Sequence, residues 1–131
     1  MSVNKERVDD WVAALRSGEY KQGGGQLHSV YDNEFCCLGV LCDVFMKANP
    51  GYSWDNNYFS KDNAQLESAY PTKEVMEYFG LDGLNPLNDG NPRVLVNGES
   101  VSCAQLNDTR NYTFQKIADV IEENFLKDES N

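Results

Sequence analysis

Four cysteines and one histidine carry the most reactive side chains of this chain, because thiolate and imidazole serve as zinc ligands and as nucleophile and base. Cys36, Cys37 and Cys42 lie in a nearly unbroken apolar run, and Cys103 stands apart from them. A zinc knuckle needs two thiolates two to four residues apart on a tight turn, a spacing that this run does not provide. We therefore expect no metal site and interpret the cysteines as buried free thiols. A disulfide from Cys103 to Cys36 or Cys37 is the alternative.

A cysteine hydrolase is the catalytic alternative that these residues leave open. It would use His28, the one histidine of the sequence, as the base that holds a thiolate. A hairpin over residues 26–36 would bring His28 near Cys36 or Cys37, but the sequence supplies neither a third group nor an oxyanion hole. We therefore favour a protein that is not an enzyme, and we assign no catalytic residue and no cofactor.

Asp43 also requires an explanation, because an ionised carboxylate inside an apolar run is costly unless it is paired or reaches solvent. The local cations considered as partners are Arg16 and Lys21, where the first predicted helix gives way to a loop. A salt bridge from one of them to Asp43 is the structural interpretation. The functional interpretation is a pocket with Asp43 as its polar floor. Its candidate ligand-binding residues are Arg16, Tyr20, Lys21, Gln22, Asp43 and Trp54.

Helical periodicity identifies the elements that must position these residues. Apolar residues at i, i+3, i+4 and i+7 predict a first helix that Ser17-Gly18 ends, and a last helix that Thr113 caps. The apolar run predicts a buried helix over residues 37–48, which other elements must cover on both faces. Two further helices are expected over residues 71–79 and from the capping box that Ser102 and Gln105 form.

Turn signals predict two small β-hairpins beside the helices. One lies over residues 26–36, and the other over residues 93–102, with Asn97-Gly98 as its two-residue turn. Residues 52–63 are polar but rich in aromatic side chains, and we expect an ordered loop there. The sequence thus predicts an α+β fold of three to four helices around a buried central helix. It forms a single domain over residues 1–131, with residues 126–131 as a frayed tail.

The charge of the chain restricts its partners. Its net charge is −10, and the whole acidic excess lies in residues 22–131, where seventeen acidic residues face seven basic ones. Such a surface repels phosphate backbones and anionic membranes. No secretory leader pattern opens the chain, and no apolar run approaches the roughly 20 residues that span a bilayer. We expect a cytoplasmic protein with neither a nucleic-acid partner nor a membrane partner.

Three segments resemble a known group of proteins. They are residues 11–23 (WVAALRSGEYKQG), residues 35–43 (FCCLGVLCD), and Leu106-Asn107-Asp108 followed by the apolar positions of the last helix. Together they resemble a family of small proteins encoded by bacteriophages and some bacteria, to which no activity is assigned. The resemblance does not extend over residues 49–102. It implies an accessory protein of phage type in the cytoplasm of the bacterial host, and it transfers no catalytic residue.

These observations favour a binding or host-interaction module that is not an enzyme. It would act through residues 16–22, Asp43 and the aromatic loop over residues 52–59. The alternative is a protein that binds or sequesters a nucleotide signal, with Arg16 and Lys21 on its phosphate groups. The sequence leaves open whether the partner is a protein or a small molecule, and which oligomeric state the protein adopts.

Overall fold

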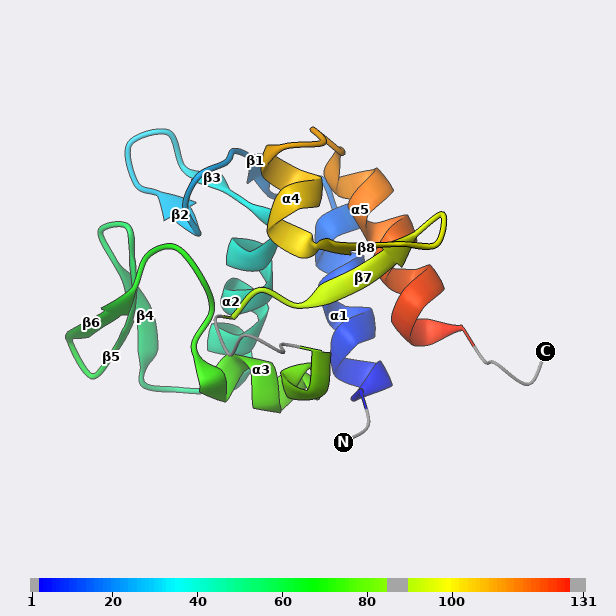
Figure 1. Ribbon diagram of the computed structural model, residues 1–131. Helices are drawn as coiled ribbons and strands as arrows, with labels where there is room; N and C mark the ends of the chain where they lie inside the picture. The colour runs from blue at the N-terminus through cyan, green and yellow to red at the C-terminus, as the bar shows by residue number, and fades with distance from the viewer. Residues whose placement is uncertain (1–2, 85–89, 128–131) are drawn as a thin grey trace.

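Five α-helices form the body of the computed structural model, which describes residues 3–84 and 90–127 (Figure 1). They are α1 (Lys5–Arg16), α2 (Cys37–Ala48), α3 (Lys73–Phe79), α4 (Cys103–Asp108) and α5 (Phe114–Ile121). Two short helical turns are η1 (Asp82–Leu84) and the π-helical η2 (Glu122–Leu126), which continues α5. Three small sheets complete the molecule, and the predicted α+β fold class is confirmed.

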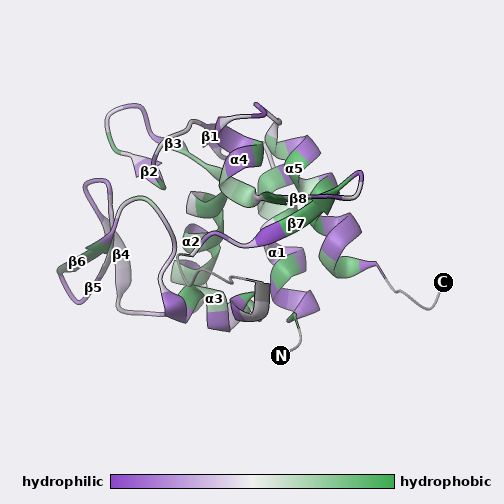
Figure 2. Ribbon diagram, in the orientation of Figure 1, coloured by the Kyte–Doolittle hydropathy of each residue, from purple (hydrophilic) through white to green (hydrophobic). Residues whose placement is uncertain are grey.

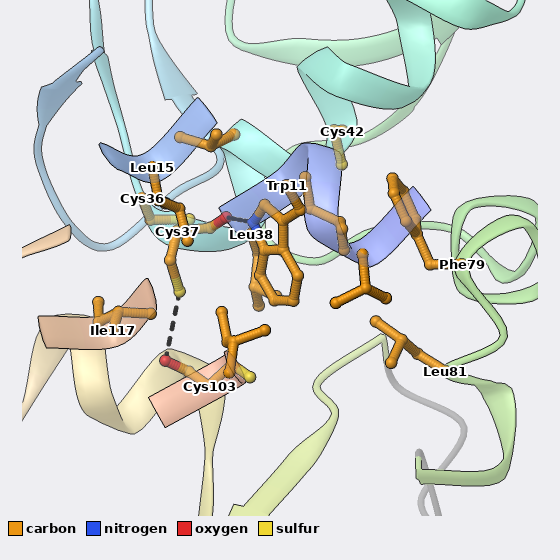
Figure 3. Close-up of a cluster of buried hydrophobic side chains, with 14 of the residues drawn as sticks. Trp11, Leu15, Cys36, Cys37, Leu38, Cys42, Phe79, Leu81, Cys103 and Ile117 are labelled. Carbon is orange, nitrogen blue, oxygen red and sulfur yellow. Dashed lines mark hydrogen bonds between the residues drawn. The ribbon is translucent and has the colours of Figure 1, made fainter. Parts of the chain in front are cut away.

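The predicted central helix is confirmed as α2, with the bounds that the sequence predicts. Helices α1, α3 and α4 each pack against α2, and α5 packs against α1. The apolar sides of the helices form the interior of the molecule (Figure 2). Trp11 of α1 is fully buried there, and its Nε1 donates a hydrogen bond to the carbonyl oxygen of Cys37 at 3.0 Å (Figure 3). This bond fixes α1 against the start of the central helix.

Gly39 lies in the first turn of α2, where glycine is normally less favourable than alanine by about 1 kcal/mol. Here the backbone of the preceding loop requires it. A Cβ atom on Gly39 would overlap the carbonyl oxygen of Leu27. That oxygen accepts a hydrogen bond from the Cys36 amide at 3.2 Å, so the loop wraps closely over the start of the helix. The glycine permits the approach that brings this loop onto the core.

The predicted hairpin over residues 26–36 forms, but its strands are short. β2 (His28–Ser29) pairs antiparallel with β3 (Glu34–Phe35). A third strand, β1 (Lys21–Gln22), pairs parallel with β3 and was not expected from the sequence. Two residues carry no periodicity, so this strand exists only because the chain leaving α1 passes beside β3.

The interpretation of residues 52–63 as a loop is wrong, because this segment begins a three-stranded meander. Its strands are β4 (Tyr52–Asp55), β5 (Tyr58–Lys61) and β6 (Ala64–Glu67). Asn56, Asp62 and Asn63 adopt positive φ angles at the two turns, a conformation that Asn and Asp tolerate best among residues other than glycine. The strands carry few apolar residues, so the alternation that indicates a strand is weak. Phe59 is fully buried, and its packing against the core stabilises strands that the sequence pattern does not indicate.

The second predicted hairpin is confirmed with its register. β7 (Arg93–Val96) pairs with β8 (Glu99–Ser102), which places Val94 opposite Val101. The predicted capping box of Ser102 and Gln105 starts α4. The carboxamide of Asn124 in η2 donates to the carbonyl oxygen of Leu95 and accepts from its amide, at 3.0 and 2.8 Å. A side chain thereby occupies backbone groups on the outer edge of β7.

η2 ends at Leu126, and Lys127 is its C-cap residue. Leu126 of the predicted tail belongs to η2, and residues 128–131 lie outside the described residues. None of the helices in the described ranges combines the length and the apolar character needed to cross a bilayer.

Candidate functional site

Asp43 is paired, as the sequence predicts, but with other partners. Its carboxylate accepts hydrogen bonds from the Tyr20 hydroxyl and from Nε1 of Trp54, the latter at 3.0 Å. Nζ of Lys47 lies 3.5 Å from the carboxylate, one turn further along α2. The expected salt bridge to Arg16 or Lys21 is wrong, because helical geometry already supplies a cation at i+4.

Arg16 and Lys21 face other carboxylates. The guanidinium of Arg16 contacts Asp119 at 2.7 Å and Glu122 at 3.3 Å, which joins the end of α1 to α5 and η2. Hydrogen bonds to these two carboxylates raise the pKa of Arg16. Nζ of Lys21 lies 3.5 Å from Glu34 on the neighbouring strand. Both cations expected to bind a ligand are therefore engaged within the chain.

The cluster of Tyr20, Asp43 and Trp54 joins three elements around one carboxylate. Burial, and then the hydrogen bond to Asp43, raise the pKa of the Tyr20 hydroxyl. Nζ of Lys47 donates to that hydroxyl at 3.1 Å, and this bond raises the pKa of Lys47. Phe35 packs edge-on against Tyr20 and Trp54. The cluster attaches Tyr20, which directly precedes β1, and the β4 strand to α2, and its polar atoms already bind one another.

Gln22 lies in a second polar network, which closes on Asn107 of α4. Nε2 of Gln22 donates to Oδ1 of Asn107 at 2.9 Å and to the carbonyl oxygen of Tyr112 at 2.7 Å. Its Oε1 accepts from the amide of Phe114, the first residue of α5, at 3.1 Å. One carboxamide therefore connects β1 to α4 and to the start of α5.

Asn107 is 5% exposed and uses all four of its hydrogen-bonding positions within the protein. Besides Gln22, its Oδ1 accepts from the Cys37 amide at 3.2 Å. Its Nδ2 donates to the Gly23 carbonyl oxygen and to Oδ1 of Asp108, both at 2.8 Å. Each of the three segments that carry the resemblance contributes a residue to this network. The contacts between these three segments have a structural role, because a buried carboxamide such as that of Asn107 is costly unless all its hydrogen-bonding positions are used.

A pocket of about 490 Å³ lies beside this network. Its lining residues are Gln22, Gly23, Gly24, Gly25, Asn107, Asp108, Asn111, Tyr112 and Thr113. Its volume is within the range of small-molecule sites. Of the six predicted ligand-binding residues, Gln22 lines this pocket, three form the Asp43 cluster, and Arg16 and Lys21 belong to neither. Sequence reasoning missed Asn107 and Asp108, although both stand in one of the segments that carry the resemblance.

The four cysteines are buried free thiols. Burial raises the pKa of Cys36 to about 11 and that of Cys103 to about 12, and it raises the pKa of the other two well above the usual range. Sγ of Cys37 donates to the carbonyl oxygen of Cys103 at 3.5 Å (Figure 3). The described residues contain no group of three or more His, Cys, Asp or Glu side chains that could hold a metal ion. These thiols remain protonated at neutral pH and pack as small apolar side chains.

His28 is not placed to activate any of these thiols. Its ring packs against Phe35 and Trp54, with centroids 4.4 and 4.9 Å apart. Nε2 lies 3.3 Å from Oδ1 of Asn33, and Nδ1 is buried with no hydrogen-bond partner among the residues that the structure describes. The ring of His28 therefore makes no hydrogen bond to a cysteine sulfur.

Exposed apolar side chains gather in one lobe, which we define as residues 27–34 together with residues 52–70. The two segments are joined by hydrogen bonds from the Val30 amide to Asn57 at 2.7 Å and from the Leu27 amide to the Ser68 carbonyl oxygen at 2.8 Å. Both project from the same side of the helical body (Figure 1). Among the described residues, six large apolar side chains are exposed, and this lobe carries five of them. The five, which we call the lobe surface, are Val30, Tyr31, Tyr58, Leu66 and Tyr70.

Comparison with known proteins places the chain in a family. A family model described as Domain of unknown function (DUF8296) matches residues 3–125, so the chain belongs to this family. No curated protein and no solved structure matches the chain. The family description assigns no activity, and the function must be argued from the geometry.

Proposed function

We propose that this protein is a binding module without enzymatic activity, which recognises a protein partner through the lobe surface. We further propose that it serves as an accessory protein of phage type in the cytoplasm of a bacterial host. The observation that carries the proposal is the concentration of exposed apolar side chains in one lobe. Exposed apolar groups of this kind are typical of interaction sites, and tyrosine is enriched among residues that dominate binding energy.

The remaining polar groups support a protein partner over a small ligand. Gln22 and Asn107 beside the pocket use their carboxamides to bind one another and the backbone. Arg16 and Lys21, the cations that would bind phosphate, are paired with carboxylates and do not line the pocket. Asp108 adds a carboxylate, which repels an anionic ligand.

Removal of two exposed tyrosines tests the proposal. Tyr31→Ala combined with Tyr58→Ala removes two aromatic side chains from the lobe, and Leu95→Ala is the matched control, because Leu95 is 60% exposed on β7. Each variant is used as bait in the bacterial host, and captured proteins are quantified by mass spectrometry. We expect proteins retained by the wild type and the control to be lost with the lobe variant. Equal capture by all three baits would contradict the proposal.

The pocket beside Asn107 favours a second candidate, the binding of a nucleotide signal. A ligand that binds only the folded state raises the melting temperature, and the stabilisation grows with the logarithm of the ligand concentration relative to its dissociation constant. A thermal-shift panel of nucleotides at millimolar concentration separates the candidates. If the lobe carries the function, no nucleotide stabilises the protein, whereas a shift that Gly24→Leu abolishes would favour the pocket.

A further inference from the structure

We propose that the partner presents an arginine-rich basic segment to the lobe surface. This inference rests on the proposed function and specifies its partner. The two segments of the lobe contain five acidic residues against one basic residue, Lys61. Of the acidic residues, Glu34 is paired with Lys21 from outside the lobe. Asp32, Asp62 and Glu67 are exposed, and no ion pair to them occurs among the described residues.

Some carboxylates elsewhere in the chain are paired with cations, whereas no ion pair to Asp9 or Asp10 of α1 occurs among the described residues. Asp119 and Glu122 bind Arg16, and Glu99 binds Arg110 at 2.8 Å. What distinguishes Asp32 and Glu67 is their position, because they directly follow the exposed side chains of Tyr31 and Leu66. Complementary charge on a binding partner would both steer its approach and fix its orientation.

Arginine fits this surface better than lysine does. Tyr31 is 92% exposed and directly precedes Asp32, which places an aromatic ring and a free carboxylate next to each other in the chain. A guanidinium stacks on the first and binds the second through two parallel hydrogen bonds. The chain itself uses the stacking mode, since the guanidinium of Arg7 lies over the Tyr78 ring at 3.9 Å.

Side chains of the partner, and not an added strand, would provide the contact. β6 is an edge strand, and all four of its residues are exposed. Gln65 pairs with Ser60 and Glu67 pairs with Phe59, so Leu66 is the extra residue of a bulge. A bulge twists an edge strand away from further pairing. The backbone edge is thereby protected, while the Leu66 side chain remains available as an apolar contact.

A display library of random short peptides tests this inference with a defined probe. The wild-type protein, Asp32→Lys/Glu67→Lys, Tyr31→Ala/Tyr58→Ala and the control Asp9→Lys/Asp10→Lys are immobilised, and selected peptides are sequenced. The control reverses two exposed charges on α1. Circular dichroism verifies that each variant is folded. We expect the wild type to select peptides with arginine next to apolar residues. Asp32→Lys/Glu67→Lys should bind these peptides about tenfold more weakly, whereas the control should bind them as tightly as the wild type does. High salt should weaken the binding.

The outcomes separate this inference from the proposed function. Peptides that need the two tyrosines but carry no excess of arginine, or that tolerate the charge reversal in the lobe, would overturn the inference and leave the proposed function standing. Lysine-rich peptides that bind as tightly as arginine-rich ones would overturn the preference for a guanidinium. Peptides that bind all variants equally, or no enrichment at all, would overturn both.

Discussion

The roles of several single residues in this protein follow from the space around them and from their burial away from water. Gly39 permits a backbone crossing that no other residue would allow. The Asn107 carboxamide is buried at no net loss of hydrogen bonds, because four protein groups replace water. The cysteines fill the core as protonated thiols. Their chemistry is suppressed by burial and is expected to emerge only at high pH or after unfolding.

Gly39→Ala is predicted to destabilise the protein strongly, although alanine is the better helix former. The new methyl group would overlap the Leu27 carbonyl oxygen, and the loop would have to move away from α2. We expect the free energy of unfolding in urea to fall by about 3 kcal/mol or more. Gly83→Ala is the control, because a Cβ there meets open space and φ is not positive. Equal stability of the two variants would contradict the close approach.

The thiols predict a loss of stability at alkaline pH. The folded-state pKa values of Cys36 and Cys103, about 11 and about 12, lie above the usual value of 9.0. Between pH 9 and the folded-state pKa of each thiol, the unfolded chain binds fewer protons than the folded one, so the free energy of unfolding falls as pH rises. Their contribution is fully present below pH 9 and is lost as pH rises through the folded-state values. Each thiol adds a slope of about 1.4 kcal/mol per pH unit.

Urea unfolding at a series of pH values under reducing conditions measures this slope. Cys103→Ala should show a shallower decline above pH 9 than the wild type, because one raised pKa has been removed. The comparison of slopes cancels the other groups that titrate in this range, including Tyr20, whose pKa is also raised. Identical slopes would show that Cys103 is not held as a thiol by burial.

At the scale of elements, polar side chains join segments that lie far apart in the sequence. Arg16 links α1 to α5, Gln22 links β1 to α4 and α5, and Asp43 links α2 to the meander. These links differ in strength, because the carboxylate of Asp43 is 17% exposed whereas that of Asp119 is 71% exposed. Water screens the second far more than the first.

Asp43→Ala is predicted to loosen the meander from α2. It leaves the Tyr20 hydroxyl and the Trp54 Nε1 without their acceptor, and both groups are partly buried. We expect a loss of about 2 kcal/mol in the free energy of unfolding, together with a shift in Trp54 fluorescence. Asp119→Ala removes an exposed ion pair and should cost less than about 1 kcal/mol. A larger effect of the control would show that Asp43 is not the main link.

The whole molecule combines an acidic surface with one apolar lobe. A net charge of −10 on 131 residues produces self-repulsion, which favours solubility and lowers the stability of the compact state. The lobe adds four net negative charges around exposed tyrosines. The basic partner that we propose is complementary to this acidic character.

Salt is predicted to stabilise this protein. Screening at about 0.3 M NaCl reduces repulsion among the carboxylates, so the melting temperature should rise by several degrees relative to low salt. Repetition at pH 5, closer to the isoelectric point of 4.4, should give a smaller rise because the net charge is smaller. A fall in melting temperature at neutral pH would mean that the surface ion pairs outweigh the repulsion.

Features that depend on neighbours along the chain could be predicted from the amino-acid sequence. The periodicity of α1, α2 and α5, the Asn97-Gly98 turn of the β7–β8 hairpin, and the capping box of α4 are all local, and each is confirmed. The α+β class follows from the sum of these elements. The need to pair Asp43 was also predictable, since burial of a charge is costly wherever it occurs.

The three-dimensional fold sets which groups meet across long separations in the sequence. It placed Arg16 on Asp119, brought Gln22 to Asn107 and packed Trp54 against His28, contacts that no spacing in the sequence encodes. It also formed the meander, whose short strands carry too little alternation to be recognised. The physical reason is the same in each case: hydrogen bonds and ring contacts depend on positions in space, and packing around α2 sets those positions.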